Sequence, residues 1–234
     1  MSLIGDNLQA VHQAIDEAAA AVSRDPHDVT LLAVSKTFGA DKVLDAAQAG
    51  QRAFGENYVQ EAIDKIIEAK KRAPLVDLEW HFIGPIQSNK TRLIAEHFDW
   101  VHSVDREKIA LRLSEQRPHH LPPLNLCLQV NISAEASKSG AAIGDTVALA
   151  RAISVLPAIR LRGLMAIPEP SDDIARQRAA FAQVRALFQQ CRDDGIAMDT
   201  LSMGMSSDLS TAIAEGATIV RIGSAIFGKR TYAK

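Results

Sequence analysis

Residues 29–37 have the sequence Val-Thr-Leu-Leu-Ala-Val-Ser-Lys-Thr. The β-branched and apolar run from Val29 to Val34 predicts a strand that is buried on both of its faces. Residues 3–24 precede this run with an amphipathic helical pattern, in which the apolar positions are Ile4, Leu8, Val11, Ile15, Ala19 and Val22. A helix followed by a doubly buried strand indicates an α/β protein with parallel strands.

The same alternation of strand and helix continues along the chain. Further strand patterns begin at Arg52, Glu79, Trp100, Asn125, Arg160, Thr200 and Thr218, and helical patterns lie between them, for example at residues 40–49, 58–72, 106–116, 146–156 and 174–192. Eight such units favour a single closed (β/α)8 (TIM) barrel. The alternative is a doubly wound open sheet, but such sheets more often have about five or six strands, and no GxGxxG motif follows the first strand. No linker interrupts the pattern, so we expect one domain over residues 1–234.

Composition and charge exclude several classes of protein. The chain is 47% hydrophobic and 23% charged, with a formal net charge of −2. This balance argues against binding to nucleic acid or to an anionic membrane surface. The sequence shows neither a secretory signal pattern nor a long apolar stretch, so we expect a cytoplasmic protein. Cys127 and Cys191 lack metal-ligand spacing and are predicted to be buried thiols, while His119-His120 falls in an exposed turn; we expect no metal site.

In a (β/α)8 barrel, functional side chains gather at the C-terminal ends of the strands. Lys36 stands where the first strand meets its loop, a position that by itself indicates no more than a surface lysine. His81 also lies late in its strand, and the sequence leaves open whether it reaches the barrel mouth or is an ordinary buried histidine. The positions that we predict to bind a cofactor at this end are Lys36, Asn57, Ile83, Met203, Ser206, Arg221, Gly223 and Ser224.

The loops after the last two strands point to the nature of the ligand. Residues 204–208 (GMSSD) and 223–225 (GSA) combine glycine with serine, and each leads into a helix. Glycine lets the backbone approach a ligand and serine supplies hydroxyl donors, so these loops predict a phosphate site, although Ser206 and Ser224 could also be simple helix caps. Arg221 is predicted to lie inside the barrel, where it needs a partner such as a carboxylate or a ring nitrogen. A lysine for an aldehyde, a phosphate cradle and an arginine for a ring nitrogen together indicate pyridoxal 5'-phosphate (PLP).

Six motifs extend this interpretation from residue 33 to residue 228. They are AVSKT (33–37), FGENYVQE (54–61), WHFIGPIQSNK (80–90), VHSVD (101–105), SMGMSSDLSTAI (202–213) and VRIGSAIFG (220–228). The chain thereby resembles the YggS/PROSC family of PLP homeostasis proteins. The resemblance implies a barrel like the N-terminal domain of alanine racemase (PLP fold type III), with Lys36 forming the Schiff base. It further implies Asn57 beside the cofactor ring, Arg221 near the pyridine nitrogen, and phosphate contacts from Ser206, Gly223 and Ser224.

Two functions remain after this comparison. The first is a carrier that holds PLP, limits its free concentration and hands it to apoenzymes; the second is a PLP-dependent racemase or related enzyme with weak activity. The resemblance to racemases is incomplete, because Ile167 stands where they have an imidazole and because they carry a further C-terminal domain. A cation at the ring nitrogen also disfavours protonation of the ring and weakens it as an electron sink. We therefore expect the carrier, acting as a monomer and without a firm catalytic residue.

Overall fold

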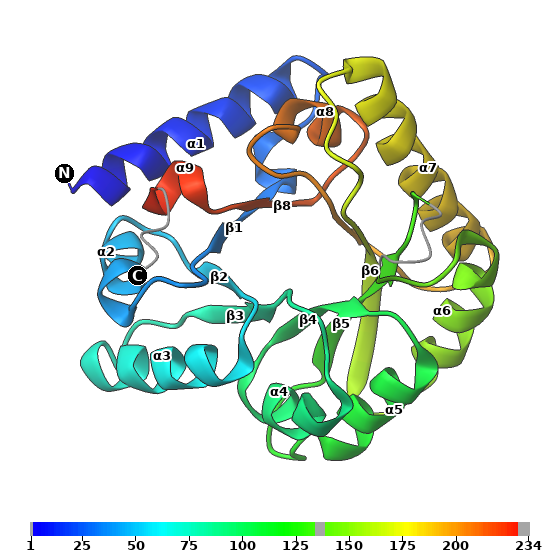
Figure 1. Ribbon diagram of the computed structural model, residues 1–234, viewed down its shortest axis with the longest axis horizontal. Helices are drawn as coiled ribbons and strands as arrows, with labels where there is room; N and C mark the ends of the chain where they lie inside the picture. Colours follow the sequence, from blue (N-terminus) through cyan, green and yellow to red (C-terminus); the bar gives the residue numbers. More distant parts are fainter. Residues whose placement is uncertain (1, 134–138, 229–234) are drawn as a thin grey trace.

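The computed structural model describes residues 2–133 and 139–228. In this part of the chain, eight parallel strands pair in sequence order and close into a barrel, with the last strand beside the first (Figure 1). The barrel closes through the register Thr30↔Ile219 to Ala33↔Ile222. The expected (β/α)8 fold is confirmed, and the open doubly wound sheet is excluded.

Each strand lies within two residues of the position that the sequence predicts. Their bounds are β1 (Thr30–Val34), β2 (Ala53–Glu56), β3 (Glu79–Phe82), β4 (Trp100–Val104), β5 (Leu124–Val130), β6 (Ile159–Ala166), β7 (Thr200–Ser202) and β8 (Ile219–Ile222). The strands span three to eight residues, and all of them run in the same direction around the barrel. The polar residues that follow them are therefore placed at its C-terminal mouth.

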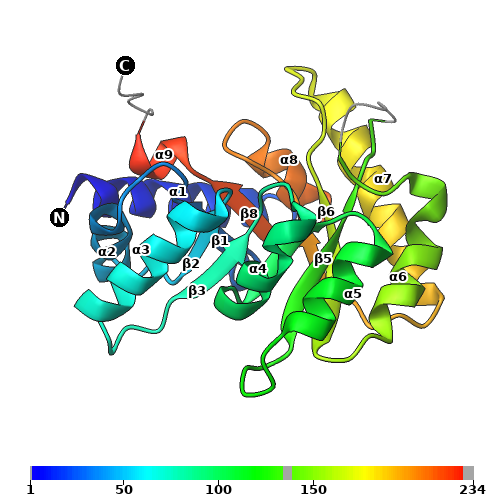
Figure 2. The same ribbon diagram turned by 60° about the horizontal axis from the view of Figure 1, so that its bottom comes forward.

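Helices surround the barrel, and Figure 2 shows α9 and the loop before α8 rising on the same side of it. The helices are α1 (Leu3–Ala20), α2 (Ala40–Gln48), α3 (Val59–Arg72), α4 (Thr91–His97), α5 (Glu107–Gln116), α6 (Thr146–Ser154), α7 (Ile174–Asp193), α8 (Leu209–Ala214) and α9 (Ser224–Phe227), with 3-10 turns at Pro26–Asp28, Ser88–Lys90 and Ile143–Asp145. None of the helices in residues 2–133 and 139–228 is both long and apolar enough to cross a bilayer.

Helix α1 ends four residues before its predicted boundary. Ser23 adopts a left-handed backbone conformation (φ 56°), and the Arg24 N–H donates to the Ala19 carbonyl. This Schellman-type end stops the helix with a serine where glycine is more usual. Helix α1 then packs along the outside of α8 and α9, to which Asn7 and Arg24 are tied by hydrogen bonds to the carbonyls of Ile226 and Ile213.

The apolar residues form two cores. One fills the barrel lumen and contains Leu32, Ala53, Trp100, Cys127, Met165 and Ile219. The larger core lies between the barrel wall and the helices and includes Cys191. Both cysteines are buried free thiols, as predicted, and burial raises the pKa of Cys127 to about 12. The lumen is packed rather than open, so a ligand can enter only at the ends of the barrel.

Candidate functional site

A cavity of about 450 Å³ lies at the C-terminal mouth of the barrel. The predicted site residues that line it are Lys36, Asn57, Ile83, Ser206, Arg221, Gly223 and Ser224. They follow or end five different strands, so that only the closed barrel brings them together. The rest of the lining is Val34, Phe38, Ile167, Met205, Ser207 and Gly228.

Two other positions that the sequence singles out lie elsewhere. Met203 is fully buried in the core beneath the helices, and the methionine of the cavity lining is Met205. This differs from the prediction because neighbouring residues of an extended chain point to opposite sides, and Ser202 takes the side that faces the lumen. His81 lies inside the barrel, hydrogen-bonded to His102 and Glu79. Lys138, whose contact with a cofactor the sequence leaves open, lies outside the described residues.

The backbone around Lys36 is held from below by two glutamates. The Ser35 hydroxyl donates to Glu56 Oε1 over 2.6 Å, and the Thr37 N–H donates to Glu61 Oε1 over 2.6 Å. Thr37 has a left-handed backbone (φ 70°), which a β-branched residue adopts only when its surroundings impose it. These contacts fix the turn that presents the half-buried Lys36 side chain to the cavity.

A buried ion pair supports this turn, and the sequence analysis did not identify it. Lys65 Nζ lies 2.5 Å from Glu56 Oε1 and donates to the Ser35 carbonyl over 2.9 Å. The two side chains are 3% and 0% exposed, and burial raises the pKa of the Glu56 carboxyl while Lys65 lowers it. One sequence signal existed: Lys65 occupies the buried face of α3, three residues after Ala62 and four before Ala69.

Arg221 reaches the cavity from β8 with its guanidinium inside the barrel. It donates to the Ser202 carbonyl (2.6 Å), the Ser202 hydroxyl (2.8 Å) and the Ala166 carbonyl (3.0 Å). Burial lowers the pKa of Arg221 to about 10, so the side chain is still a cation at neutral pH. Its hydrogen-bond acceptors in the described part of the chain are all neutral. Of the two partners that the sequence predicts for Arg221, a carboxylate or a ring nitrogen, no carboxylate of the described residues accepts a hydrogen bond from it.

The two serine-containing loops do not use Ser206 and Ser224 as helix caps. The cap positions are Asp208 for α8 and Gly223 for α9, and neither cap makes a side-chain hydrogen bond to its helix. Gly204 has φ 98°, where a Cβ would also lie 2.6 Å from Ala212 Cβ, and Asp208 orders the loop by accepting the Met205 N–H over 2.5 Å. Ser206 and Ser224 therefore line the cavity without being the cap residues of the two helices.

Asn57 supplies a test of whether a ligand fits. Its Oδ1 is buried and has no hydrogen-bond partner within residues 2–133 and 139–228, although Asn57 lines the cavity. Its backbone is fixed by Gly84, where a Cβ would lie 2.1 Å from the Asn57 carbonyl oxygen. A buried polar atom without a partner is costly, so the site is incomplete without a polar molecule. Within the same described residues no group of three or more His, Cys, Asp or Glu could hold a metal ion.

Fold and site together define a barrel that holds a small polar ligand at its mouth, between an amine, a buried cation and two hydroxyl groups. The chain belongs to the family of the alanine racemase N-terminal domain, whose model matches residues 7–231. It is 62% identical to a pyridoxal phosphate homeostasis protein of Pseudomonas aeruginosa, over 99% of this chain and 98% of that protein. It is 52% identical to the protein of that name in Escherichia coli, over the full length of both chains.

Solved structures agree with this membership. The chain matches PipY of Synechococcus elongatus, crystallised with PLP bound, with a TM-score of 0.80 and 41% identity over 92% of this chain and 100% of PipY. It also matches alanine racemase of Corynebacterium glutamicum with a TM-score of 0.70, over 97% of this chain and 61% of the racemase. That second match has 16% identity and shows the fold alone. The resemblance to PLP homeostasis proteins is confirmed.

Proposed function

We propose that this chain binds PLP at the mouth of its barrel and acts in PLP homeostasis. The observation that carries the proposal is the single cavity that joins Lys36, Ser206, Ser224 and Arg221. The names of the relatives and the PLP bound to PipY support the same function. The match of donor set to ligand supports it independently, because PLP has an anionic group, a ring nitrogen and an aldehyde.

Bound PLP supplies an aldehyde that condenses reversibly with an amine. Lys36 would be the attacking amine in this proposal, because it lines the cavity beside the serine-containing loops and a primary amine is the group that condenses with an aldehyde. The turn held by Glu56 and Glu61 keeps that amine at the cavity. At the other side, the hydroxyl groups of Ser206 and Ser224 and the backbone at Gly223 bind the phosphate, as the loops after the last two strands do in other barrels.

Arg221 and Asn57 complete the proposed site. The guanidinium of Arg221 donates a hydrogen bond to the ring nitrogen, and its positive charge keeps that nitrogen unprotonated. Asn57 offers its unpartnered Oδ1 to the polar edge of the ring. Holding the ring in this form makes it a poor electron sink, which suits a protein that stores the cofactor more than one that transforms amino acids.

The alternative function, a PLP-dependent racemase, would need a second proton-transfer group opposite Lys36. At the position where the resemblance predicts an imidazole in racemases, the cavity is lined by the apolar and half-exposed Ile167. We expect no Cα exchange at enzyme rates when the PLP-loaded protein is incubated with L-alanine or L-serine in deuterium oxide. Rapid exchange with inversion, lost in Lys36→Ala, would support the racemase.

The finer parts of the proposal concern the cellular setting. We infer that residues 1–234 form one domain, that the protein acts as a monomer in the cytoplasm, and that apo forms of PLP-dependent enzymes receive the cofactor. The open mouth of the barrel supports exchange of the cofactor with such partners. Transfer is tested by mixing PLP-loaded protein with an apoenzyme and following the appearance of that enzyme's activity, with free PLP trapped by a scavenging amine.

The binding experiment is a titration of cofactor-free protein with PLP, followed by visible absorbance. We expect a saturable band that borohydride bleaches and that is absent in Lys36→Ala. Pyridoxal, which lacks the phosphate, should bind much more weakly, because it forgoes the contacts with Ser206 and Ser224. Equal affinities for PLP and pyridoxal would contradict the phosphate cradle.

A further inference from the structure

A chain of five hydrogen-bonded side chains runs through the barrel from the mouth cavity to the opposite face. Arg221 Nη1 donates to Ser202 Oγ over 2.8 Å, and the same oxygen lies 2.8 Å from His102 Nδ1. His102 Nε2 lies 2.9 Å from His81 Nδ1, and His81 Nε2 lies 2.7 Å from Glu79 Oε1. Each distance is within normal hydrogen-bond range, and the residues come from β8, β7, β4 and β3.

The hydrogen atoms of this chain can be assigned from its two ends. Arg221 only donates and an ionised Glu79 only accepts, so His81 carries its hydrogen on Nε2. With both imidazoles neutral, His81 Nδ1 accepts from His102 Nε2–H, and His102 Nδ1 accepts the Ser202 hydroxyl hydrogen. All the donors then point one way, from the cation to the carboxylate.

Burial and packing favour this single arrangement. His102 and Ser202 are fully buried and His81 is 1% exposed. Burial holds the pKa of His102 well below its usual value, and the hydrogen bond from His81 lowers the pKa of Glu79. Trp100 stacks on the His81 ring, with 5.4 Å between the ring centroids and 6° between the planes. A fully satisfied polar network among packed apolar groups has little freedom to reorient.

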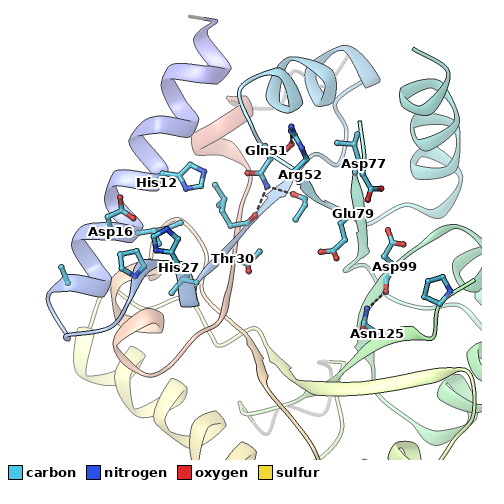
Figure 3. Close-up of a pocket in the computed structure, with 18 residues that line it drawn as sticks. His12, Asp16, His27, Thr30, Gln51, Arg52, Asp77, Glu79, Asp99 and Asn125 are labelled. Atoms are coloured by element: carbon cyan, nitrogen blue, oxygen red, sulfur yellow. Dashed lines mark hydrogen bonds between the residues drawn. The ribbon is translucent and has the colours of Figure 1, made fainter. Parts of the chain in front are cut away.

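The far end of the chain is open to solvent. Glu79 lines a cavity of about 1340 Å³ at the N-terminal face of the barrel, and its side chain is 48% exposed. Asp77 and Asp99 line the same cavity (Figure 3), and burial raises the pKa of Asp99, with a further contribution from the charge of Glu79. Asp99 is engaged with the Trp80 N–H, whereas the carboxylate of Glu79 holds the histidine pair. The protonation state of one exposed carboxylate is thus connected to a buried arginine at the other end of the lumen.

We propose that Ser202, His102, His81 and Glu79 are positioning residues for Arg221. The carbonyls of Ser202 and Ala166 accept hydrogen bonds from the Arg221 guanidinium, but they do not determine where the hydrogen of the Ser202 hydroxyl points. Arg221 can only donate to the Ser202 oxygen, and the chain fixes where the hydroxyl's own hydrogen points, which is toward His102. Glu79 sets that direction for every link, and the guanidinium is left with a fixed face toward the cavity. This inference rests on the proposed function, in which that face meets the PLP ring nitrogen.

The first test needs no cofactor. Full-length protein is labelled with ¹⁵N at its seven histidines, and the resonances of His81 and His102 are assigned by comparison with His81→Gln and His102→Gln. From the hydrogen-bond geometry, we expect both residues to carry a hydrogen on Nε2 and none on Nδ1. A protonated Nδ1 on His102 would overturn the assigned direction.

The second test asks whether the chain senses the ring end of the ligand. Addition of PLP should shift the His102 resonances and, to a smaller extent, those of the more distant His81, and both shifts should be lost in Ser202→Ala. Inorganic phosphate, which can occupy the cradle without a ring, should leave both histidines unchanged. If PLP gives its full visible band while both histidines stay unmoved, the positioning role is wrong. If no visible band forms at all, the proposed function fails, and the first test still decides whether the chain exists.

A matched pair of variants tests the role of Glu79. Glu79→Gln and Asp77→Asn remove the same charge from the same cavity, but only Glu79 contacts the histidines. We expect Glu79→Gln to mix the imidazole tautomers and to move the pH midpoint of the visible band by about half a unit or more. Asp77→Asn should change neither. Equal effects of the two substitutions would mean that Glu79 acts only through its charge in the cavity, and this would overturn its assignment as a positioning residue.

Discussion

Replacing Lys65 by methionine should destabilise the protein strongly, because it removes the cation from a buried ion pair and leaves Glu56 in place. The Glu56 side chain is fully buried, and its Oε2 already lacks a hydrogen-bond partner in the described part of the chain. Breaking such a pair by removing one partner costs about 3–5 kcal/mol of unfolding free energy. For a chain of this size, that corresponds to a fall in Tm of roughly 6–20 °C.

The assay is chemical denaturation of Lys65→Met beside a matched control in the same helix. Arg72→Met also removes a cation from an ion pair, but Arg72 and Asp41 are 42% and 79% exposed. Surface pairs of this kind contribute about 0–1 kcal/mol, so the control should be nearly neutral. The double variant Lys65→Met with Glu56→Gln removes the uncompensated charge and should recover part of the loss.

The pH dependence of this loss gives an independent check. Burial raises the pKa of Glu56, and removal of Lys65 takes away an attraction that lowers it, so the pKa of Glu56 rises further in the variant. A carboxyl with a raised folded-state pKa favours folding below its unfolded-state pKa, and this advantage is lost as the pH rises through the folded-state pKa. The cost of Lys65→Met should therefore be smallest in acid and grow toward neutral pH. A cost that is independent of pH, or no larger than that of Arg72→Met, would refute the role of the pair.

Three further outcomes are expected. Gly84→Ala places a Cβ 2.1 Å from the Asn57 carbonyl oxygen, so it should lower the unfolding free energy by about 1–3 kcal/mol and weaken PLP binding; a denaturation midpoint equal to wild type would argue against the close approach. Ser206→Ala or Ser224→Ala removes a hydrogen bond to a charged group, so the Kd for PLP should rise roughly ten- to a hundredfold in an absorbance titration, and a change below twofold would contradict it. Arg221→Ala should alter the pH profile of the visible band more than the advantage of PLP over pyridoxal, and the opposite result would move Arg221 from the ring to the phosphate.

The barrel could be predicted from the sequence because its strands are short, mostly apolar and flanked by turns. Lys36 and Arg221 could be placed at its mouth because each lies at or near the end of a predicted strand. The sequence did not predict helix α4, whose seven residues (Thr91–His97) are too few to show a helical period. The sequence also did not predict the early end of α1, because serine is an unusual residue for the left-handed backbone conformation that Ser23 adopts there.

The supporting network of the site was less predictable than its lining. Glu56 and Lys65 meet only because β2 and α3 pack together, and a lysine on an amphipathic helix normally indicates the solvent face. The chain from Arg221 to Glu79 likewise joins residues from four strands that are distant in sequence. Strand periodicity shows that His81 and His102 can face the lumen, but only the closed barrel shows that they face each other.

The central claim is that Lys36 holds PLP, and the most direct measurement of it is peptide mapping after reduction. The PLP-loaded protein is treated with borohydride and digested, and the peptides are analysed by mass spectrometry for a pyridoxyl phosphate adduct. We expect the adduct on the peptide that contains Lys36 and its loss in Lys36→Ala. An adduct found mainly on Lys65, Lys138 or Lys234, or one that persists at full yield in Lys36→Ala, would contradict the account.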